Sequence, residues 1–238
     1  MSSTPSSPAP GPRSATGGTG ATARLIPVTV PREPAGAVLV LHGGSARNGQ
    51  PVVSPGQLSV LRMIPIARQI SRTAGGRLAV FRLLNSHRGW NSQLTPVHDA
   101  RWALGQIGQQ LGPGLRTCLV GHSLGGRAAL LAADHPSVTS VVALAPWVYP
   151  DDRVDAPGRR FLIVHGTADR VASPDRSAAV ARSLAATSAA SVDYITIDGG
   201  KHAMLRHHRE FTSLAASFAA ATLLGQDTTG TMTGTGIS

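Results

Sequence analysis

The sequence is poor in cysteine, in lysine and in aromatic side chains. Among its 238 residues there is a single cysteine, Cys118, which excludes an internal disulfide framework and a cysteine-based zinc or iron–sulfur site. No run of 18 apolar residues occurs, so the sequence predicts no membrane-spanning helix and no membrane partner. The length suits one ordinary domain, which can bury a sizeable core without covalent cross-links.

The charge comes almost entirely from arginine. The formal net charge is +10, and Lys201 is the only lysine beside arginines spread from Arg13 to Arg209. A clustered basic face would attract phosphates, but the sequence holds no cluster denser than Arg159–Arg160 or Arg206–Arg209. We therefore expect a solvated basic surface that can draw anionic substrates by long-range attraction, and no nucleic-acid partner.

Both ends of the chain differ in composition from the middle. Residues 1–23 are rich in Ser, Pro, Gly, Thr and Ala, and residues 225–238 form a second polar tail. Such segments cannot bury enough apolar surface to offset the cost of ordering their backbone, so we expect both to be disordered. A folded domain then spans residues 24–224. The N-terminal tail lacks the apolar stretch of a secretory signal, which favours a cytoplasmic location.

Within that domain, short apolar runs alternate with longer stretches of helical pattern. Strands are expected at 25–30, 37–42, 77–84, 115–121, 140–145, 160–165 and 192–197, and helices near 58–73, 97–111, 124–134, 174–187 and 203–224. Pro65 should break or kink the first of these helices. This alternation predicts an α/β fold with a mostly parallel sheet of about seven strands and helices on both faces. Ligands of such sheets bind at the carboxyl ends of the strands.

One of those strand ends carries the pattern G-x-S-x-G, from Gly121 through Ser123 to Gly125, between an apolar strand and a helix. The turn is so tight that the residues two before and two after the serine must lack a Cβ, and the strained serine is lifted clear of the sheet. The N-terminus of the following helix favours developing negative charge. Ser123 is therefore a candidate nucleophile.

Two later strand ends supply the partners that such a nucleophile needs. Asp169 follows the strand RRFLIV and His202 follows VDYITI, which gives the chain order Ser, Asp, His. His202 would act as general base and Asp169 would orient and stabilise its imidazole. Rival candidates remain for each role: Asp175 and Asp198 for the acid, His207 and His208 for the base, and Cys118, more simply explained by core packing, for the nucleophile.

An oxyanion site needs two backbone N–H donors. We expect one from Leu124, directly after the nucleophile, and the other from the loop HGGS after the strand AVLVL, with Gly44 first and Ser45 next. The histidines inside these motifs, His42, His122 and His165, are expected to be structural, with His165 bonding a backbone group. No histidine has metal-ligand spacing, so we expect neither a metal nor a cofactor.

Taken together, the motifs HGGS, GHSLGG, HGTADRV and GGKHAM resemble those of the α/β-hydrolase superfamily over residues 24–224. The resemblance implies an α/β-hydrolase fold with an oxyanion loop, nucleophile, acid and base at these positions. Many members insert a helical lid where this chain has only Pro146 to Gly158. The chain is therefore most similar to small lidless members of the dienelactone-hydrolase and carboxylesterase type.

Four side chains are candidates for a substrate pocket. Trp90, Trp147, Tyr149 and Arg88 fall in loops after strands, where the rings either line an apolar pocket or cap the edge of the core, and Arg88 either binds a carboxylate or is solvated.

These residues predict a serine hydrolase that cleaves a small carboxylic ester or thioester through an acyl-enzyme on Ser123. An acyltransferase, a peptidase or amidase, and a non-catalytic ligand-binding protein remain alternatives. The sequence sets no oligomeric state.

Overall fold

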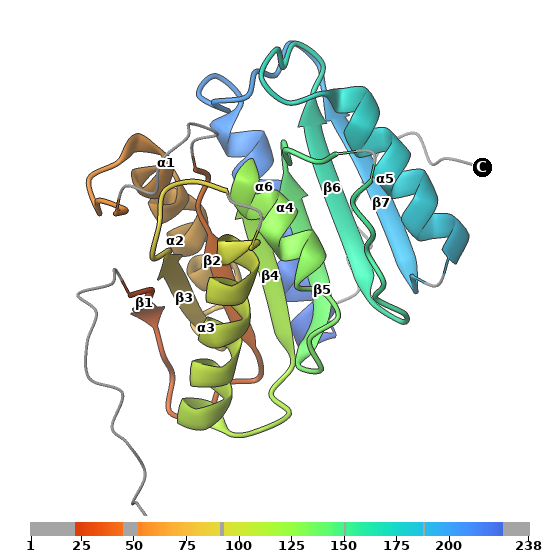
Figure 1. Ribbon diagram of the computed structural model, residues 1–238. Helices are drawn as coiled ribbons and strands as arrows, with labels where there is room; N and C mark the ends of the chain where they lie inside the picture. The colour runs from red at the N-terminus through yellow and green to blue at the C-terminus, as the bar shows by residue number, and fades with distance from the viewer. Residues whose placement is uncertain (1–21, 45–51, 91–92, 150, 188, 226–238) are drawn as a thin grey trace, which may run out of the picture.

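Seven strands form one sheet in a computed structural model that describes residues 22–44, 52–90, 93–149, 151–187 and 189–225 (Figure 1). The predicted tails fall almost wholly outside these residues. The spatial order of the strands is β1-β3-β2-β4-β5-β6-β7. Their bounds are β1 Arg24–Thr29, β2 Ala37–Leu41, β3 Ala79–Leu84, β4 Thr117–His122, β5 Val138–Leu144, β6 Arg160–Gly166 and β7 Ser191–Ile197.

The sheet is parallel except at one edge. Only β1 pairs antiparallel, with β3, and the other neighbouring pairs are parallel. All five residues of β2 and all six of β4 are buried, as expected for strands that are covered on both faces. The predicted mostly parallel sheet of about seven strands is confirmed.

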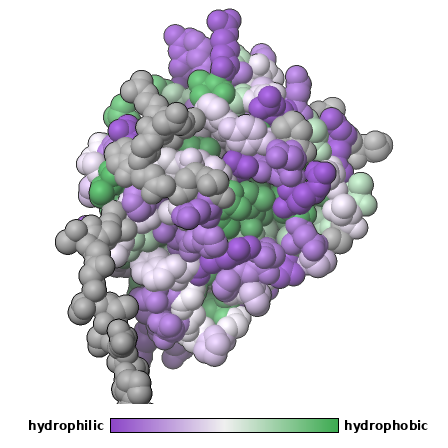
Figure 2. Space-filling view, in the orientation of Figure 1, coloured by the Kyte–Doolittle hydropathy of each residue, from purple (hydrophilic) through white to green (hydrophobic). Residues whose placement is uncertain are grey.

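Helices cover both faces of the sheet, as predicted. Their bounds are α1 Leu58–Leu61, α2 Met63–Thr73, α3 Thr95–Leu111, α4 Leu124–Leu131, α5 Pro174–Thr187 and α6 His208–Leu224. One apolar cluster joins the sheet to α3, α4 and α5, and a second joins its other face to α2 and α6. In Figure 1 the first group lies in front of the sheet and α6 lies behind it. Hydrophilic side chains cover most of this front face, with hydrophobic colour gathered near its middle (Figure 2).

Two helix boundaries differ from the sequence-based expectation. The first helical stretch breaks at Arg62, not at Pro65, which is the third residue of α2. Proline is tolerated there because N–H groups in the first turn have no acceptor within the helix. The last helix begins at His208 and not near residue 203, since Met204 has a φ of 58°, which is incompatible with a right-handed helix.

The connection between β5 and β6 is short and forms no helix within its described residues, 145–149 and 151–159. This agrees with the expected absence of a lid. None of the helices in the described ranges is long and apolar enough to cross a membrane. Because β2, β4, β6 and β7 run parallel, their carboxyl ends bring the loops after residues 41, 122, 166 and 197 to one edge of the sheet.

Candidate active site

The turn between β4 and α4 holds Ser123 in a strained conformation. Its φ is 56° and its ψ is −121°, a combination rare for a residue with a side chain. A Cβ on Gly121 would lie 2.7 Å from the nitrogen of Gly126, and one on Gly125 would lie 2.5 Å from the carbonyl oxygen of His42. Glycine is therefore required on both sides of the serine, as the G-x-S-x-G pattern predicts.

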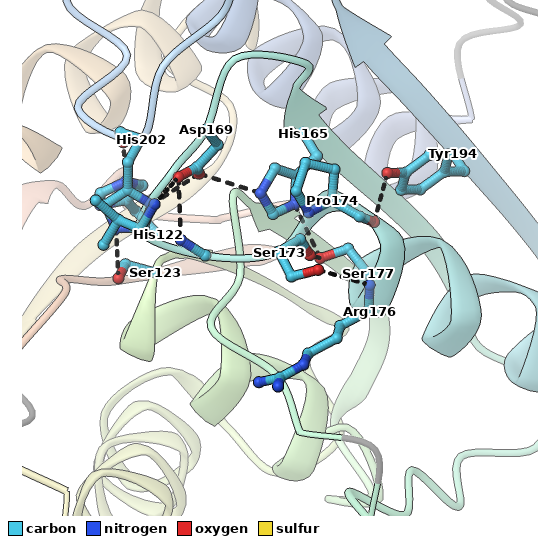
Figure 3. A network of polar contacts seen from close by, with 12 residues as sticks. His122, Ser123, His165, Asp169, Ser173, Pro174, Arg176, Ser177, Tyr194 and His202 are labelled. Carbon is cyan, nitrogen blue, oxygen red and sulfur yellow. Dashed lines mark hydrogen bonds and ion pairs between the residues drawn. The ribbon is translucent and has the colours of Figure 1, made fainter.

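The structure brings Ser123, His202 and Asp169 together in one chain of hydrogen bonds (Figure 3). The Ser123 hydroxyl lies 2.9 Å from His202 Nε2, and His202 Nδ1 lies 2.8 Å from Asp169 Oδ2. With Asp169 ionised, Nδ1–H donates to the carboxylate, which leaves Nε2 free to accept the serine proton. This tautomer is the one that a general base beside a serine hydroxyl needs.

Asp169 is held in its ionised form by several donors. Burial of the carboxyl group opposes ionisation, but hydrogen bonds from His165 and His202 and from the N–H groups of Val171 and Ala172 outweigh it. These bonds hold the pKa of Asp169 well below its usual range. The acid therefore stays negatively charged throughout the pH range in which a histidine titrates.

His165 was not identified from the sequence as part of this arrangement. Its Nε2 lies 3.1 Å from Asp169 Oδ2, the oxygen that His202 also contacts, and its Nδ1 lies 2.8 Å from Ser177 Oγ (Figure 3). The expectation that His165 bonds a backbone group is wrong, because both ring nitrogens face side chains. The sequence feature that could have predicted this contact is the spacing of His165 and Asp169, which are four residues apart on either side of a turn.

His122 fixes the loop that carries the base. Its Nε2–H donates to the carbonyl oxygen of His202 at 2.9 Å, and the two rings lie 5.1 Å apart between centroids. Complete burial, together with the nearby His202, lowers the pKa of His122 to about 3. The ring is therefore neutral, and it acts as a fixed support and not as a second base.

The loop that carries the candidate oxyanion donor Gly44 lies beside Ser123, since a Cβ on Gly43 would lie 3.3 Å from Ser123 Cβ. His42 Nδ1–H donates to the carbonyl oxygen of Gly43 at 2.6 Å, and His42 Nε2 accepts from the N–H of Asn85 at 3.1 Å. Because a trans peptide directs its N–H opposite to its C=O, this bond points the Gly44 N–H away from His42. Neither that N–H nor that of Leu124 donates to another described residue. Ser45, the second choice for this donor, lies outside the described residues.

The predicted pocket residues have other partners as well. The guanidinium of Arg127 lies between two aromatic rings, 4.1 Å from the centroid of Trp90 and 4.5 Å from that of Tyr149. Arg127 also forms a bidentate ion pair with Asp152, at 2.6 to 3.0 Å. Trp90 and Tyr149 therefore hold a buried arginine, which pairs with a structural carboxylate and does not face solvent.

The backbones of Trp147 and Arg88 contact the nucleophile and the residues around it. The Trp147 N–H donates to the carbonyl oxygen of Ser123 at 3.1 Å, and its side chain is half-buried. The carbonyl oxygen of Arg88 packs so tightly on Gly44 that a Cβ there would overlap it. The Arg88 side chain is exposed.

The rival residues lie away from this constellation. Asp198 accepts from the hydroxyl of Thr167, Asp175 is exposed in the first turn of α5, and His207 pairs with Glu210. His208 contacts the carbonyl oxygen of Leu205.

Neither a cysteine nucleophile nor a metal site competes with the Ser123 arrangement among the described residues. Burial raises the pKa of the Cys118 thiol to about 12, which makes it a poor nucleophile. Among the residues that the structure covers, no group of three or more His, Cys, Asp or Glu could hold a metal ion.

Comparisons with known proteins point to the same fold. A family model described as PET hydrolase-like matches residues 108–220, and no curated protein matches the chain. Est1E from Butyrivibrio proteoclasticus, solved with ferulic acid, is 14% identical over 85% of this chain and 96% of its own, with a TM-score of 0.61. An esterase from Pyrobaculum calidifontis is 15% identical over 85% of each chain, with a TM-score of 0.62.

A third solved structure, XC6422 from Xanthomonas campestris, is described as an α/β serine hydrolase without a lid. It is 16% identical over 84% of this chain and 87% of its own, with a TM-score of 0.60. The strand order and the strained serine turn support the same fold as these similar structures. The chain therefore has the α/β-hydrolase fold, in a form with no lid domain between β5 and β6.

Proposed function

We propose that this protein is a serine esterase that cleaves a small carboxylic ester or thioester through an acyl-enzyme on Ser123. The observation that carries the proposal is the continuous path from the Ser123 hydroxyl through His202 to Asp169, at 2.9 and 2.8 Å. Similarity to structures named as esterases supports ester substrates.

The proposed reaction begins when Ser123 Oγ attacks the substrate carbonyl carbon and its proton passes to His202 Nε2. The N–H groups of Leu124 and Gly44 bind the resulting oxyanion, and each such donor contributes about 3–4 kcal/mol in related sites. His202 then gives the proton to the departing alcohol or thiol as the carbon–oxygen or carbon–sulfur bond breaks. This leaves an acyl group on the serine.

Water completes the cycle in the second half-reaction. His202 removes a proton from a water molecule, which attacks the acyl carbon, and the carboxylic acid leaves as Ser123 recovers its proton. Asp169 stays ionised in both halves and stabilises the imidazolium. We expect hydrolysis over transfer to another alcohol, because residues 145–149 and 151–159 between β5 and β6 form no helical lid that would shield the acyl-enzyme from water.

A panel of p-nitrophenyl esters from acetate to palmitate tests this proposal. Activity should be highest on short acyl chains, since a site without a lid encloses little of a long one. Ser123→Ala should lower kcat by at least about 10⁴-fold, as removal of a serine nucleophile does elsewhere. Ser183→Ala, at an exposed position on α5, is the matched control and should retain full activity.

Two outcomes would contradict the proposal. One is a folded wild-type protein that hydrolyses none of the esters. The other is a Ser123→Ala variant that keeps the wild-type rate, which would move the nucleophile elsewhere.

A further inference from the structure

An apolar cavity of about 450 Å³ lies behind the loop that carries His202, between the beginnings of α2 and α6. Its volume falls within the range of about 300–1,000 Å³ that is usual for small-molecule sites. Most of its lining is aliphatic or aromatic, and Leu58 and Leu205 at its rim are 76% and 72% exposed. Exposed large apolar side chains around a cavity indicate a binding site for an apolar group of a ligand or partner.

A second cavity of about 450 Å³ continues from the first along the groove between α2 and α6. The two cavities share three lining residues, Pro65, His208 and Thr212. The second is basic where the first is apolar, because Arg68, Arg72 and Arg209 line it. Residues that are distant in the sequence thus form a basic groove, which the even spread of arginine along the chain did not predict.

The positive charge of the groove is not balanced by carboxylates. Of the described residues, no Asp or Glu lines either cavity, and Glu210 in the first turn of α6 bonds with His207. Arg62, on the wall of the apolar cavity, is half-buried, and its guanidinium has no hydrogen bond or ion pair with another described residue. Partial desolvation lowers its pKa, which reflects the cost of leaving this cation without a partner.

We propose that the two cavities form one binding site for an anionic amphiphile: a single alkyl chain that ends in a phosphate. The chain would fill the apolar cavity, and the phosphate would lie on the arginines of the adjoining groove. Guanidinium groups suit this ligand because their fork of N–H donors matches phosphate oxygens. Bound phosphate would also relieve the repulsion between arginines that no carboxylate neutralises.

The form of the site favours a free amphiphile over larger partners. A nucleic acid would use the arginines but would leave the apolar cavity empty. A membrane would contact the exposed Leu58 and Leu205 at the rim but would leave the cavity behind them unfilled. The wall of that cavity is formed by the buried side chains of Ile66, Met204 and Phe211. The site includes no triad residue, so the inference does not depend on the proposed esterase activity.

Calorimetric titration with alkyl phosphates below their micelle concentration tests the proposal. The affinity should rise about fourfold for each added methylene from butyl to decyl phosphate, until the apolar cavity is full. Decyltrimethylammonium, which has the same chain and the opposite charge, should not bind. Decyl phosphate should also raise the melting temperature of the wild-type protein, since it binds only the folded state.

Two variants separate the roles of charge and cavity. Arg68→Gln/Arg209→Gln should weaken the binding of decyl phosphate by about tenfold or more for each arginine removed. The matched control Arg24→Gln/Arg182→Gln makes the same change in net charge at two arginines that line neither cavity, and it should leave the affinity nearly unchanged. Thr212→Phe, at the junction of the cavities, should abolish the dependence on chain length.

Several results would overturn the proposal. Affinity that is the same for decyl phosphate and decyltrimethylammonium would show adsorption without charge recognition. Equal binding by the two double variants would remove the groove from the site. Binding to phosphatidic acid vesicles but not to monomeric decyl phosphate would make the surface a membrane contact. Tight binding of a DNA duplex that is lost in Arg68→Gln/Arg209→Gln, with no binding of decyl phosphate, would make it a nucleic-acid contact.

Discussion

Gly166→Ala should disturb the candidate active site without touching any of its side chains. Gly166 ends β6 and lies directly against Gly200, which precedes the base by two residues. A Cβ at position 166 would lie 2.7 Å from Gly200 Cα and closer still to its carbonyl group, whereas ordinary contact begins at 3.4 Å. The two loops must therefore separate by at least about 0.7 Å.

The two loops that would move apart carry the acid, Asp169, and the base, His202. The Asp169 N–H bonds to the Gly166 carbonyl oxygen, and the Ala168 N–H bonds to that of Gly200, so the substitution acts on both loops. A displacement on the order of 1 Å in a catalytic arrangement can cost about 10²-fold in rate. Overpacking of this kind also costs about 1–3 kcal/mol of unfolding free energy. We expect kcat/KM to fall by about two orders of magnitude while the protein still folds.

The assay compares kcat/KM on p-nitrophenyl acetate with the unfolding free energy from urea titration, for Gly166→Ala and a matched glycine variant. Gly105→Ala is the control, because a Cβ there meets nothing within 4 Å in α3. It should stabilise the protein by about 0.5–1 kcal/mol through helix propensity and leave activity unchanged. A Gly166→Ala variant with wild-type kcat/KM and stability would refute the reasoning that this close approach sets the distance between acid and base.

Three further predictions concern buried groups. Asp169→Asn should lower kcat by about 10⁴-fold through loss of the correct His202 tautomer. The pKa of Asp169 in the folded state lies below the unfolded value of about 3.9, so the ionised carboxylate stabilises the fold fully at pH 7 and less as the pH falls. The difference in unfolding free energy between wild type and Asp169→Asn should therefore be smaller at pH 3 than at pH 7. His165→Leu should cost about 1.5–3 kcal/mol in urea unfolding, the usual contribution of a hydrogen bond to a charged group. Cys118 should resist alkylation at neutral pH until the protein unfolds, as measured by mass spectrometry, and rapid native labelling would contradict its burial.

Local patterns in the sequence predicted the sheet and the residues at its carboxyl edge. Continuous apolar runs located the strands, and the steric demand of the serine turn fixed Gly121 and Gly125. Ser123, Asp169 and His202 were identified from their order along the chain and their positions after strands, and the parallel sheet brings them together. The strands and the serine turn follow from short-range rules, because each depends on the residues within one strand or turn, whereas the chain order of the three residues is a property of the fold.

Two helix boundaries and the features that depend on packing between distant elements could not be predicted. The split at Arg62 depends on how Pro65 is accommodated in the first turn of α2, and the late start of α6 depends on the backbone of Met204. The two rings around Arg127 come from different loops. The basic groove likewise requires two helices that are more than 100 residues apart in sequence to lie side by side, which spacing along the chain does not reveal.

Labelling with a fluorophosphonate tests the central claim most directly, because the reagent reacts far faster with an activated serine than with an ordinary hydroxyl group. After incubation of the wild-type protein at pH 7 and proteolysis, mass spectrometry should find the phosphonyl group on Ser123 alone. Asp169→Asn should label far more slowly, and Ser123→Ala should not label. Modification of any other residue, or undiminished labelling of Ser123→Ala, would contradict the assignment of Ser123 as the nucleophile activated by His202.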